Sequence, residues 1–181
     1  MKELSLNILD VAENSVKAGA SLTQIIIEET AETLTIKIVD DGCGMDEDTV
    51  RSVTDPFYTT RTTRKVGLGI PLLKLAAEQT GGSFSITSKS DKEYPDGHGT
   101  CVEAVFFKNH LDFTPLGDVV SSVITLIQGH DDTDFLFSHN GPDGLSVSLD
   151  TRELRNVLGD VPLSEYDVIK WIEEYLKEQY T

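Results

Sequence analysis

The stretch Ile38-Val39-Asp40-Asp41-Gly42-Cys43-Gly44-Met45 decides the fold of this chain. Apolar residues alternate up to it, at Leu34, Ile36 and Ile38, which is typical of a half-buried β-strand. The strand delivers the backbone to Asp40, and the two glycines that follow permit positive φ angles and a close approach of another group. The stretch therefore predicts either the wall of a pocket with one acid pointing inward or a plain surface turn after a strand.

The composition sets the class of protein. The chain has 181 residues, of which 39% are hydrophobic, so it can form one domain of ordinary size, with or without a small appendage. It contains no run of the roughly 18 apolar residues that a membrane span needs, and its N-terminus lacks a signal-peptide pattern. Cys43 and Cys101 show no metal-site spacing and fit a reducing compartment. We therefore expect a cytoplasmic protein that does not bind a membrane.

The charge of the chain is strongly negative and unevenly spread. A net charge of −16 argues against binding to a nucleic-acid backbone, which requires clustered Lys and Arg. Residues 1–108 carry 11 basic and 17 acidic side chains, whereas residues 109–181 carry 4 and 14. Solubility alone explains many acidic segments. The contrast nevertheless indicates two parts with different roles.

Residues 3–18 are expected to form a helix because apolar residues recur at helical spacing. Its polar residues share one face, since they recur at steps of three, four and three: Asn7, Asp10, Asn14 and Lys17. A polar stripe is usually the solvated side of an amphipathic helix. Asparagine is a poor helix former, however, so two of them in register suggest that this face has another role.

A short basic segment interrupts the acidic chain at Arg61, Arg64 and Lys65. It directly precedes Gly67-Leu68-Gly69-Ile70-Pro71, where a helix is expected to begin because proline suits the first helical position. Free backbone N–H groups and the helix dipole at such a start attract phosphate groups. The segment therefore predicts an anion site, with a solvated loop as the alternative.

Periodicity and turn residues predict the remaining elements. The expected strands are 23–29, 33–40, 83–88, 101–107, 134–138 and 145–150. The other expected helices are 46–53, 71–80, one that begins at Thr114-Pro115 and ends at Gly129, 152–158 capped by Gly159, and a last one opened by a capping box of Ser164 and Asp167.

Separated stretches of the chain resemble, in order, the motifs of the GHKL superfamily of gyrases, ATP-dependent chaperones, histidine kinases and MutL-type repair proteins. Asp10 to Ser21 resembles the N box and is close to the form that this motif has in MutL proteins. Asp40 to Met45 resembles the first glycine box. Asp55 to Arg61 is similar to the phenylalanine box of histidine kinases. Gly67 to Gly69 and Gly97 to Thr100 resemble the second and third glycine boxes.

This resemblance covers residues 3–108 and says nothing about residues 109–181. It implies an α+β fold, a two-layer α/β sandwich of the Bergerat type that holds ATP between the helices and one end of the sheet. We therefore expect an ATP-binding domain over residues 1–108. Residues 109–181 are expected to form a small αββαα C-terminal domain of unknown role, packed on the sandwich or against another chain.

The resemblance also implies roles at the adenine end of an ATP site. Asp40 matches the acid that accepts a hydrogen bond from the adenine amino group, whereas Asp41 should face elsewhere. Gly42 and Gly44 would let the ring lie near the backbone. The same end would include Met45, packed on the ring, and Thr100, near the adenine.

At the phosphate end, Asn14 matches the residue that coordinates Mg²⁺, a hard cation that takes oxygen ligands. Lys17 would reach a phosphate or remain solvated. The basic segment lies where such proteins keep a lid, and it would neutralise charge on the γ-phosphate. The remaining residues that the resemblance assigns to ATP are Phe57, Arg61, Arg64, Lys65, Gly67, Leu68 and Gly69.

Asp10 bears on the reaction. It lies four residues before Asn14, where GHKL hydrolases usually carry Glu, and it could act as a general base for water or for a Ser or Thr hydroxyl. The alternative is that Asp10 only orders Mg²⁺-bound water. No phosphoacceptor helix precedes Asp10 in this sequence, so self-phosphorylation is not expected.

The leading hypothesis is a magnesium-dependent ATP-binding protein, similar to the catalytic domains of histidine kinases and anti-sigma-factor kinases, that acts on a separate protein. An ATP-controlled interaction module without phosphotransfer and a slow GHKL ATPase are the alternatives, and self-association stays open.

Overall fold

The computed structural model describes residues 3–55 and 68–181, and the strands in these residues form one six-stranded sheet in the order β3-β4-β2-β1-β5-β6. Neighbouring strands are antiparallel except β1 and β5, which run parallel. The strands are β1 (Leu22–Glu29), β2 (Thr33–Asp40), β3 (Ser83–Lys89), β4 (Gly99–Phe107), β5 (Asp134–Asn140) and β6 (Ser146–Asp150).

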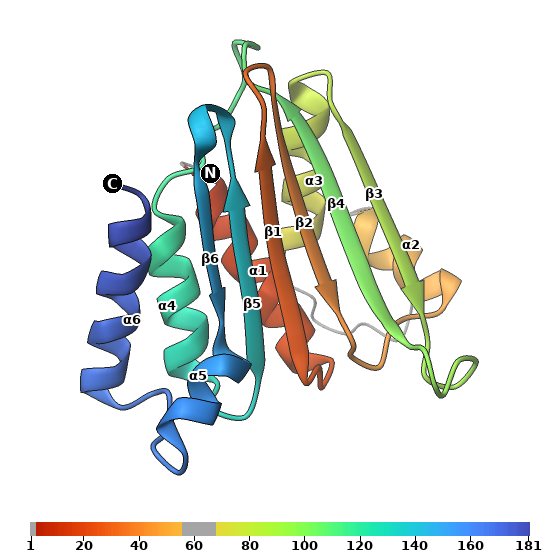
Figure 1. Ribbon diagram of the computed structural model, residues 1–181. Coiled ribbons are helices and arrows are strands. Elements are labelled where there is room, and N and C mark those ends of the chain that lie inside the picture. Colours follow the sequence, from red (N-terminus) through yellow and green to blue (C-terminus); the bar gives the residue numbers. More distant parts are fainter. Residues whose placement is uncertain (1–2, 56–67) are drawn as a thin grey trace.

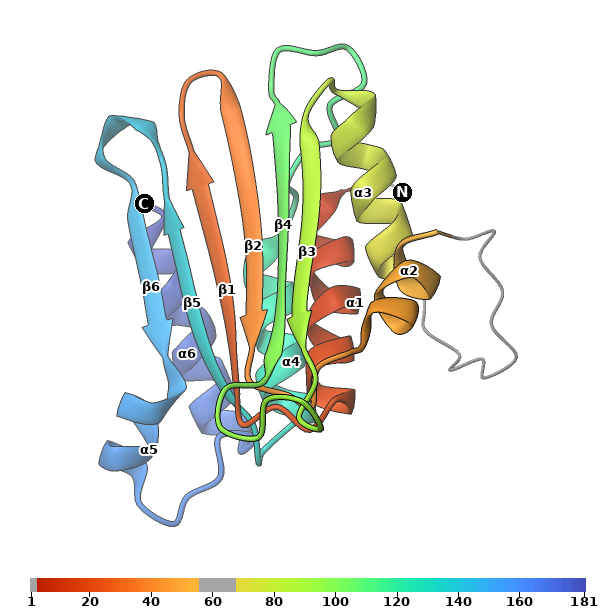
Figure 2. The ribbon, with the colours of Figure 1, turned by 90° about the vertical axis from the view of Figure 1, so that its right-hand side faces the viewer.

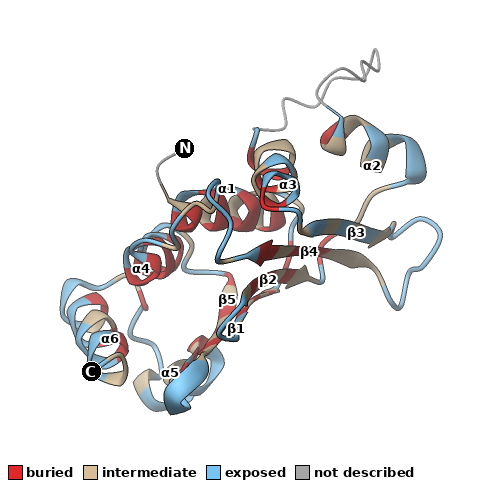
Figure 3. Cartoon of the chain, turned by 90° about the horizontal axis from the view of Figure 1, so that it is seen from above, coloured by how far each residue is buried: buried red, intermediate tan, exposed pale blue. Residues whose placement is uncertain are grey.

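The long helices lie side by side on one face of the sheet (Figure 1, Figure 3). They are α1 (Leu4–Lys17), α3 (Gly69–Gln79), α4 (Val119–Gly129) and α6 (Tyr166–Gln179). The short helix α2 (Glu47–Thr54) lies beside α3, and α5 (Thr151–Leu158) continues directly from β6. The expected two-layer α/β sandwich of the α+β class is therefore confirmed.

Buried and less buried residues alternate along the strands, and this alternation explains why the helices cover one face of the sheet. Ile25 and Ile27 on β1, and Ile36 and Ile38 on β2, are fully or almost fully buried beneath the helices. Their neighbours on the opposite face are only partly buried or exposed. In the part of the chain that the structure describes, no helix is long and apolar enough to cross a membrane.

Residues 109–181 share this sheet and its core. β5 pairs with β1 in the middle of the sheet, and Phe135 and Phe137 on β5 belong to the same buried cluster as Ile25. Of the two arrangements expected for this segment, the structure shows packing on the sandwich. Whether residues 109–181 also act as a separate unit with its own role stays a prediction.

Two local predictions in this segment were wrong because distant partners compete for the same groups. The helix expected from Thr114 begins only at Val119, since the carbonyls of Pro115 and Leu116 accept hydrogen bonds from the backbone N–H groups of Leu4 and Ser5, each at 2.8 Å. The capping box at Ser164 does not form either. That hydroxyl donates instead to Asp131, at 2.7 Å, and the helix begins at Tyr166.

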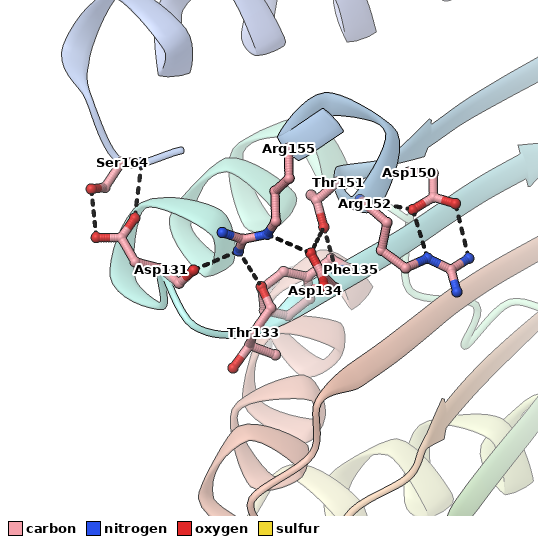
Figure 4. Close-up of polar contacts among 9 residues, drawn as sticks. All are labelled: Asp131, Thr133, Asp134, Phe135, Asp150, Thr151, Arg152, Arg155 and Ser164. Carbon is pink, nitrogen blue, oxygen red and sulfur yellow. Dashed lines mark hydrogen bonds and ion pairs between the residues drawn. The ribbon is translucent and has the colours of Figure 1, made fainter. Parts of the chain in front are cut away.

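A polar cluster holds α5 and the loop after it against the start of β5 (Figure 4). The Arg155 guanidinium donates through Nε to Asp134 Oδ1, at 2.7 Å, and through Nη2 to the carbonyls of Asp131 and Thr133. Asp134 Oδ1 also accepts from the Thr151 hydroxyl, at 2.8 Å. The Arg155 side chain thus donates to three acceptors, one carboxylate and two backbone carbonyls. Its removal would leave each of them with one donor fewer.

We predict that Arg155→Ala lowers the free energy of unfolding by about 1–2 kcal/mol, because it leaves these acceptors without their charged donor. Urea denaturation at pH 7 measures this. Arg152→Ala is the matched control, since among the described residues the exposed Arg152 side chain forms its hydrogen bonds and ion pair with the nearby Asp150 alone, so its loss should be clearly smaller. Equal losses in the two variants would contradict the role given to Arg155.

Candidate functional site

A cavity of about 230 Å³ is lined by residues of α1, α2, α3, β2 and β4 and of the loop after β2. Figure 2 shows how these elements lie relative to one another. Its walls are mainly apolar, with a few polar groups at defined places, as is usual for small-molecule sites. The residues that line it are Val11, Asn14, Ser15, Lys17, Ala18, Ile38, Asp40, Gly44, Met45, Thr49, Val53, Ile70, Thr100 and Val102.

Asp40 ends β2 and places its carboxylate in this cavity. Its Oδ2 accepts a hydrogen bond from the Ser15 hydroxyl at 2.7 Å, and its Oδ1 accepts one from the backbone N–H of Gly42 at 2.9 Å. Thr100 lies directly opposite Asp40 in the β2–β4 register. Each carboxylate oxygen can accept more than one hydrogen bond, so the held carboxylate can still receive a donor from a ligand.

Asp41 faces away from the cavity, toward the start of β1. Its Oδ1 accepts from the backbone N–H groups of Ser21 and Leu22, at 2.7 and 3.0 Å, and its Oδ2 accepts from the Ser21 hydroxyl. Burial alone raises the pKa of Asp41, but these hydrogen bonds outweigh it and lower the pKa below its ordinary value. The two adjacent acids therefore have different environments: Asp40 lines the cavity, and Asp41 binds the backbone at the start of β1.

The glycines after β2 allow the chain to pack against itself. Gly44 has a φ of +70°, and a Cβ there would lie 1.9 Å from the carbonyl oxygen of Lys89. A Cβ on Gly42 would lie 2.9 Å from that of Ala18. Gly44 lines the cavity, whereas Gly42 is not among its lining residues. These close contacts explain why a larger side chain would not fit at either position. The expected role of the two glycines beside an adenine ring stays a prediction.

The polar stripe of α1 divides into buried and exposed members. Asn7 is fully buried; its Nδ2 donates weakly to the carbonyl of Gly69, at 3.4 Å, and its Oδ1 has no partner among the described residues. Asn14 lines the cavity, and its Nδ2 is buried without a partner in the described part of the chain. Lys17 is exposed at the cavity wall. Asn14 and Lys17 are thus the members of the stripe that line the cavity.

Asp10 is exposed and does not line the cavity. It lies against the start of α3, because a Cβ built on Gly69 would come within 2.9 Å of the Asp10 Cβ. Gly69 is buried in the first turn of that helix, and Leu68 before it is 63% exposed. The other expected ligand residues, Phe57, Arg61, Arg64, Lys65 and Gly67, lie outside the described residues.

Sequence reasoning missed much of the cavity wall. Ser15, which holds Asp40, follows Asn14 directly but falls off the polar stripe that drew attention to α1. Thr49 and Val53 on α2 and Ile70 on α3 reach the cavity only through tertiary packing. The sequence signal for these three is no more than apolar or small residues at helical spacing, which also describes ordinary core positions.

We predict that Asp41→Asn lowers the free energy of unfolding at pH 7, and that its difference from the wild type shrinks as the pH falls from about 5 to 3. The reason is linkage: a carboxyl whose pKa is lower in the folded than in the unfolded chain stabilises the fold above the unfolded value, near 3.8, and loses this effect as the pH falls through the folded value.

Urea denaturation across this pH range measures the effect. Asp48→Asn, at an exposed position of α2, is measured in parallel as the control for the loss of one surface carboxylate. A constant difference between Asp41→Asn and the wild type would exclude the proposed charge effect.

Two curated proteins are similar in sequence to this chain. The tetrathionate sensor histidine kinase TtrS of Salmonella typhimurium is 29% identical over 100 residues, which cover 55% of this chain and 16% of that protein. The DNA mismatch repair protein MutL of Listeria monocytogenes is 26% identical over an alignment of 186 positions, gaps included. This alignment covers 85% of this chain and 31% of MutL. The chain thus spans less than a third of the length of either curated relative.

A solved structure shows the same fold. The MutL ATPase domain of Aquifex aeolicus, complexed with ADP, matches with a TM-score of 0.56 at 14% identity, and the match covers 87% of this chain and 69% of that one. The family model for histidine kinase-, DNA gyrase B-, and HSP90-like ATPases matches residues 2–111, which is more than half of the chain. The protein therefore belongs to the family of histidine kinase-, DNA gyrase B- and HSP90-like ATPases.

Proposed function

We propose that this protein binds ATP with Mg²⁺ in the cavity beside Asp40 and acts, as a kinase-like domain, on a separate protein in the cytoplasm. The observation that carries the proposal is the Asp40 carboxylate, held by Ser15 and Gly42 at the base of an apolar cavity with Thr100 opposite. The unpaired Cys43 and Cys101 fit a reducing compartment.

The cavity suits an adenine ring. Ile38, Met45 and Val102 provide apolar surface for its faces. Asp40 can accept a hydrogen bond from the exocyclic amino group, and a charged acceptor in a partly buried place gives a strong and selective contact. The Ser15 hydroxyl and the Gly42 N–H fix the carboxylate before the ligand arrives, so little ordering is needed on binding.

The residues present also fit Mg²⁺. The Asn14 Nδ2 is buried without a partner among the described residues, and no hydrogen bond within them involves the Asn14 Oδ1, which could serve as a neutral ligand at the cavity. No group of three or more His, Cys, Asp or Glu side chains suited to a metal occurs in the described residues. Mg²⁺ usually keeps several waters and substrate phosphate oxygens as ligands, so one protein ligand suffices. When bound, the ion would neutralise charge on the phosphates.

Asp10 is the proposed general base. It is exposed next to the start of α3, whose free N–H groups suit phosphate oxygens. From there its carboxylate could take the proton from a Ser or Thr hydroxyl or from water. Since the residue lies beside the cavity rather than in its wall, its contribution should concern the reaction more than the affinity for ATP.

A second candidate, a slow ATPase of MutL type, is favoured by one observation. The match to the Listeria MutL covers 85% of this chain, whereas the match to the Salmonella sensor kinase covers 55%. An ATP-controlled interaction module without phosphotransfer is the related alternative. Incubation with ATP labelled at its γ-phosphate distinguishes the three hypotheses. Label on a partner protein supports the kinase, and labelled free phosphate supports the ATPase. Neither product supports the interaction module.

We predict that Asp40→Asn and Asn14→Ala each weaken Mg-ATP binding by roughly tenfold or more, because each removes a contact to a charged or metal-bound group. Isothermal titration calorimetry measures this. Asp41→Asn is the neighbouring control and should keep the wild-type affinity within about twofold, as its carboxylate faces Ser21. Equal losses at positions 40 and 41 would show that the acid assigned to adenine is the wrong one.

We further predict that Asp10→Asn reduces the rate of γ-phosphate release or transfer by roughly 100-fold, within the range that a general base contributes. ATP affinity should change by less than about threefold. Single-turnover assays with saturating Mg-ATP measure the rate. A rate equal to the wild type would leave Asp10 with a role in ordering water only.

A further inference from the structure

A second concave surface is lined by residues of β5, β6, α5 and α6. Figure 1 shows these elements at the β6 edge of the sheet. This groove has a volume of about 280 Å³, and we name it the aromatic groove. Its lining includes Leu136, Glu153, Leu154, Trp171 and Tyr175. None of these residues lines the cavity beside Asp40. The aromatic groove is therefore a distinct feature that ATP binding does not explain.

The ring pair of α6 dominates this groove. Trp171 is 50% exposed and Tyr175 is 38% exposed, and their rings stack at 5.1 Å between centroids with planes 7° apart. α6 is held to the core by a different face, through Ile169, Ile172 and Leu176, which are almost fully buried. The stacked rings are thus not needed to attach the helix, and they offer a flat aromatic surface of the kind that concentrates binding energy in protein interfaces.

The neighbouring sheet edge is already covered. Ser148 on the edge strand β6 would present an unpaired N–H and C=O, but the Gln179 side-chain amide bonds both, at 2.9 and 3.0 Å. An incoming segment therefore has no free strand edge at this residue. Its contacts in the groove must come from side chains rather than from β-strand addition.

Acids outnumber basic residues around the rings. The helix α6 carries four acids against two lysines, Lys170 and Lys177, and Lys177 is paired with Glu173. Glu153 lines the groove, and Glu174 and Glu178 lie on α6 within one turn of the rings. The side chains of these three acids make no hydrogen bond or close ion pair within residues 3–55 and 68–181, although Glu153 interacts electrostatically with the neighbouring Arg152. The one acid of the lining that is neutralised is Asp150, by Arg152. Residues 109–181 as a whole carry 14 acids against 4 basic side chains.

We propose that the aromatic groove docks a basic segment of a partner protein, with an arginine guanidinium stacked on the Trp171–Tyr175 pair. Aromatic faces attract guanidinium groups, and unpaired acids at the rim attract further basic side chains and speed the encounter. This inference goes beyond the proposed function, because it depends neither on ATP nor on phosphotransfer. It assigns residues 109–181 a role in partner recognition.

Trp171 is the only tryptophan of the chain, so its fluorescence reports on the groove directly. The full chain is titrated with a synthetic nonapeptide of alternating Arg and Gly, and with a matching peptide of Glu and Gly. A saturable fluorescence change is expected for the Arg peptide and none for the Glu peptide. Raising the salt concentration from 50 to 300 mM should weaken binding by roughly fivefold or more, since exposed charges are screened.

Variants are compared through the anisotropy of a labelled Arg peptide. Trp171→Ala and the double variant Glu153→Gln/Glu174→Gln should each weaken binding by roughly fivefold or more. The matched controls lie elsewhere on the surface: Tyr94→Ala removes an exposed aromatic ring, and Glu47→Gln/Asp48→Asn removes two exposed charges. Both controls should bind within about twofold of the wild type.

Three results would overturn the proposal. Equal weakening in the control variants would mean that the peptide senses only the overall negative charge. Equal binding by the two peptides would remove the charge argument. A concentration-dependent dimer in sedimentation that Trp171→Ala dissolves would assign the groove to a second copy of this chain. Calorimetry with Mg-ATP on the same variants keeps this test separate from that of the proposed function.

Discussion

The packing of α1 on the sheet is the interaction on which the rest of the structure depends. Leu4, Ile8, Val11 and Ala12 are almost fully buried against the strands, and they fix the rotation of the helix about its axis. Once that rotation is set, helical geometry turns Asn14 toward the cavity and places the Ser15 hydroxyl on Asp40. The apolar face of α1 thus positions the polar groups of the candidate site.

The end of β2 provides the second half of the same constraint. Successive strand residues point to opposite faces, so Asp40 and Asp41 cannot share one environment. Asp40 is held for a ligand by two hydrogen bonds, and Asp41 secures the start of β1 by three. The β1 strand then pairs with β5, so the cavity and residues 109–181 depend on one continuous sheet. The proposed nucleotide site and the proposed partner-binding surface are thereby carried on one sheet.

The resemblance of short motifs to those of a known family was enough to predict the fold class, and it assigned both Asp40 and Thr100 to the adenine end of a site. The structure adds that these two residues are direct partners in the β2–β4 register. The parallel pairing of β5 with β1 could not be predicted, since about a hundred residues separate the strands along the chain. The same holds for Ser164, whose hydroxyl satisfies Asp131 rather than its own helix. Such tertiary competition for hydrogen-bonding groups is invisible to local propensity.

The assignment of Asp40 is tested most directly by asking whether the protein distinguishes adenine from a base that lacks its amino group. Inosine triphosphate has the same ribose and phosphates as ATP but carries an oxygen in place of that amino group, which would face the Asp40 carboxylate as a second acceptor. Calorimetry should therefore show ATP binding roughly tenfold or more tighter than inosine triphosphate, because two acceptors facing each other in a partly buried place cannot form a hydrogen bond. Equal affinities for the two nucleotides would contradict the assignment of Asp40 and of the cavity.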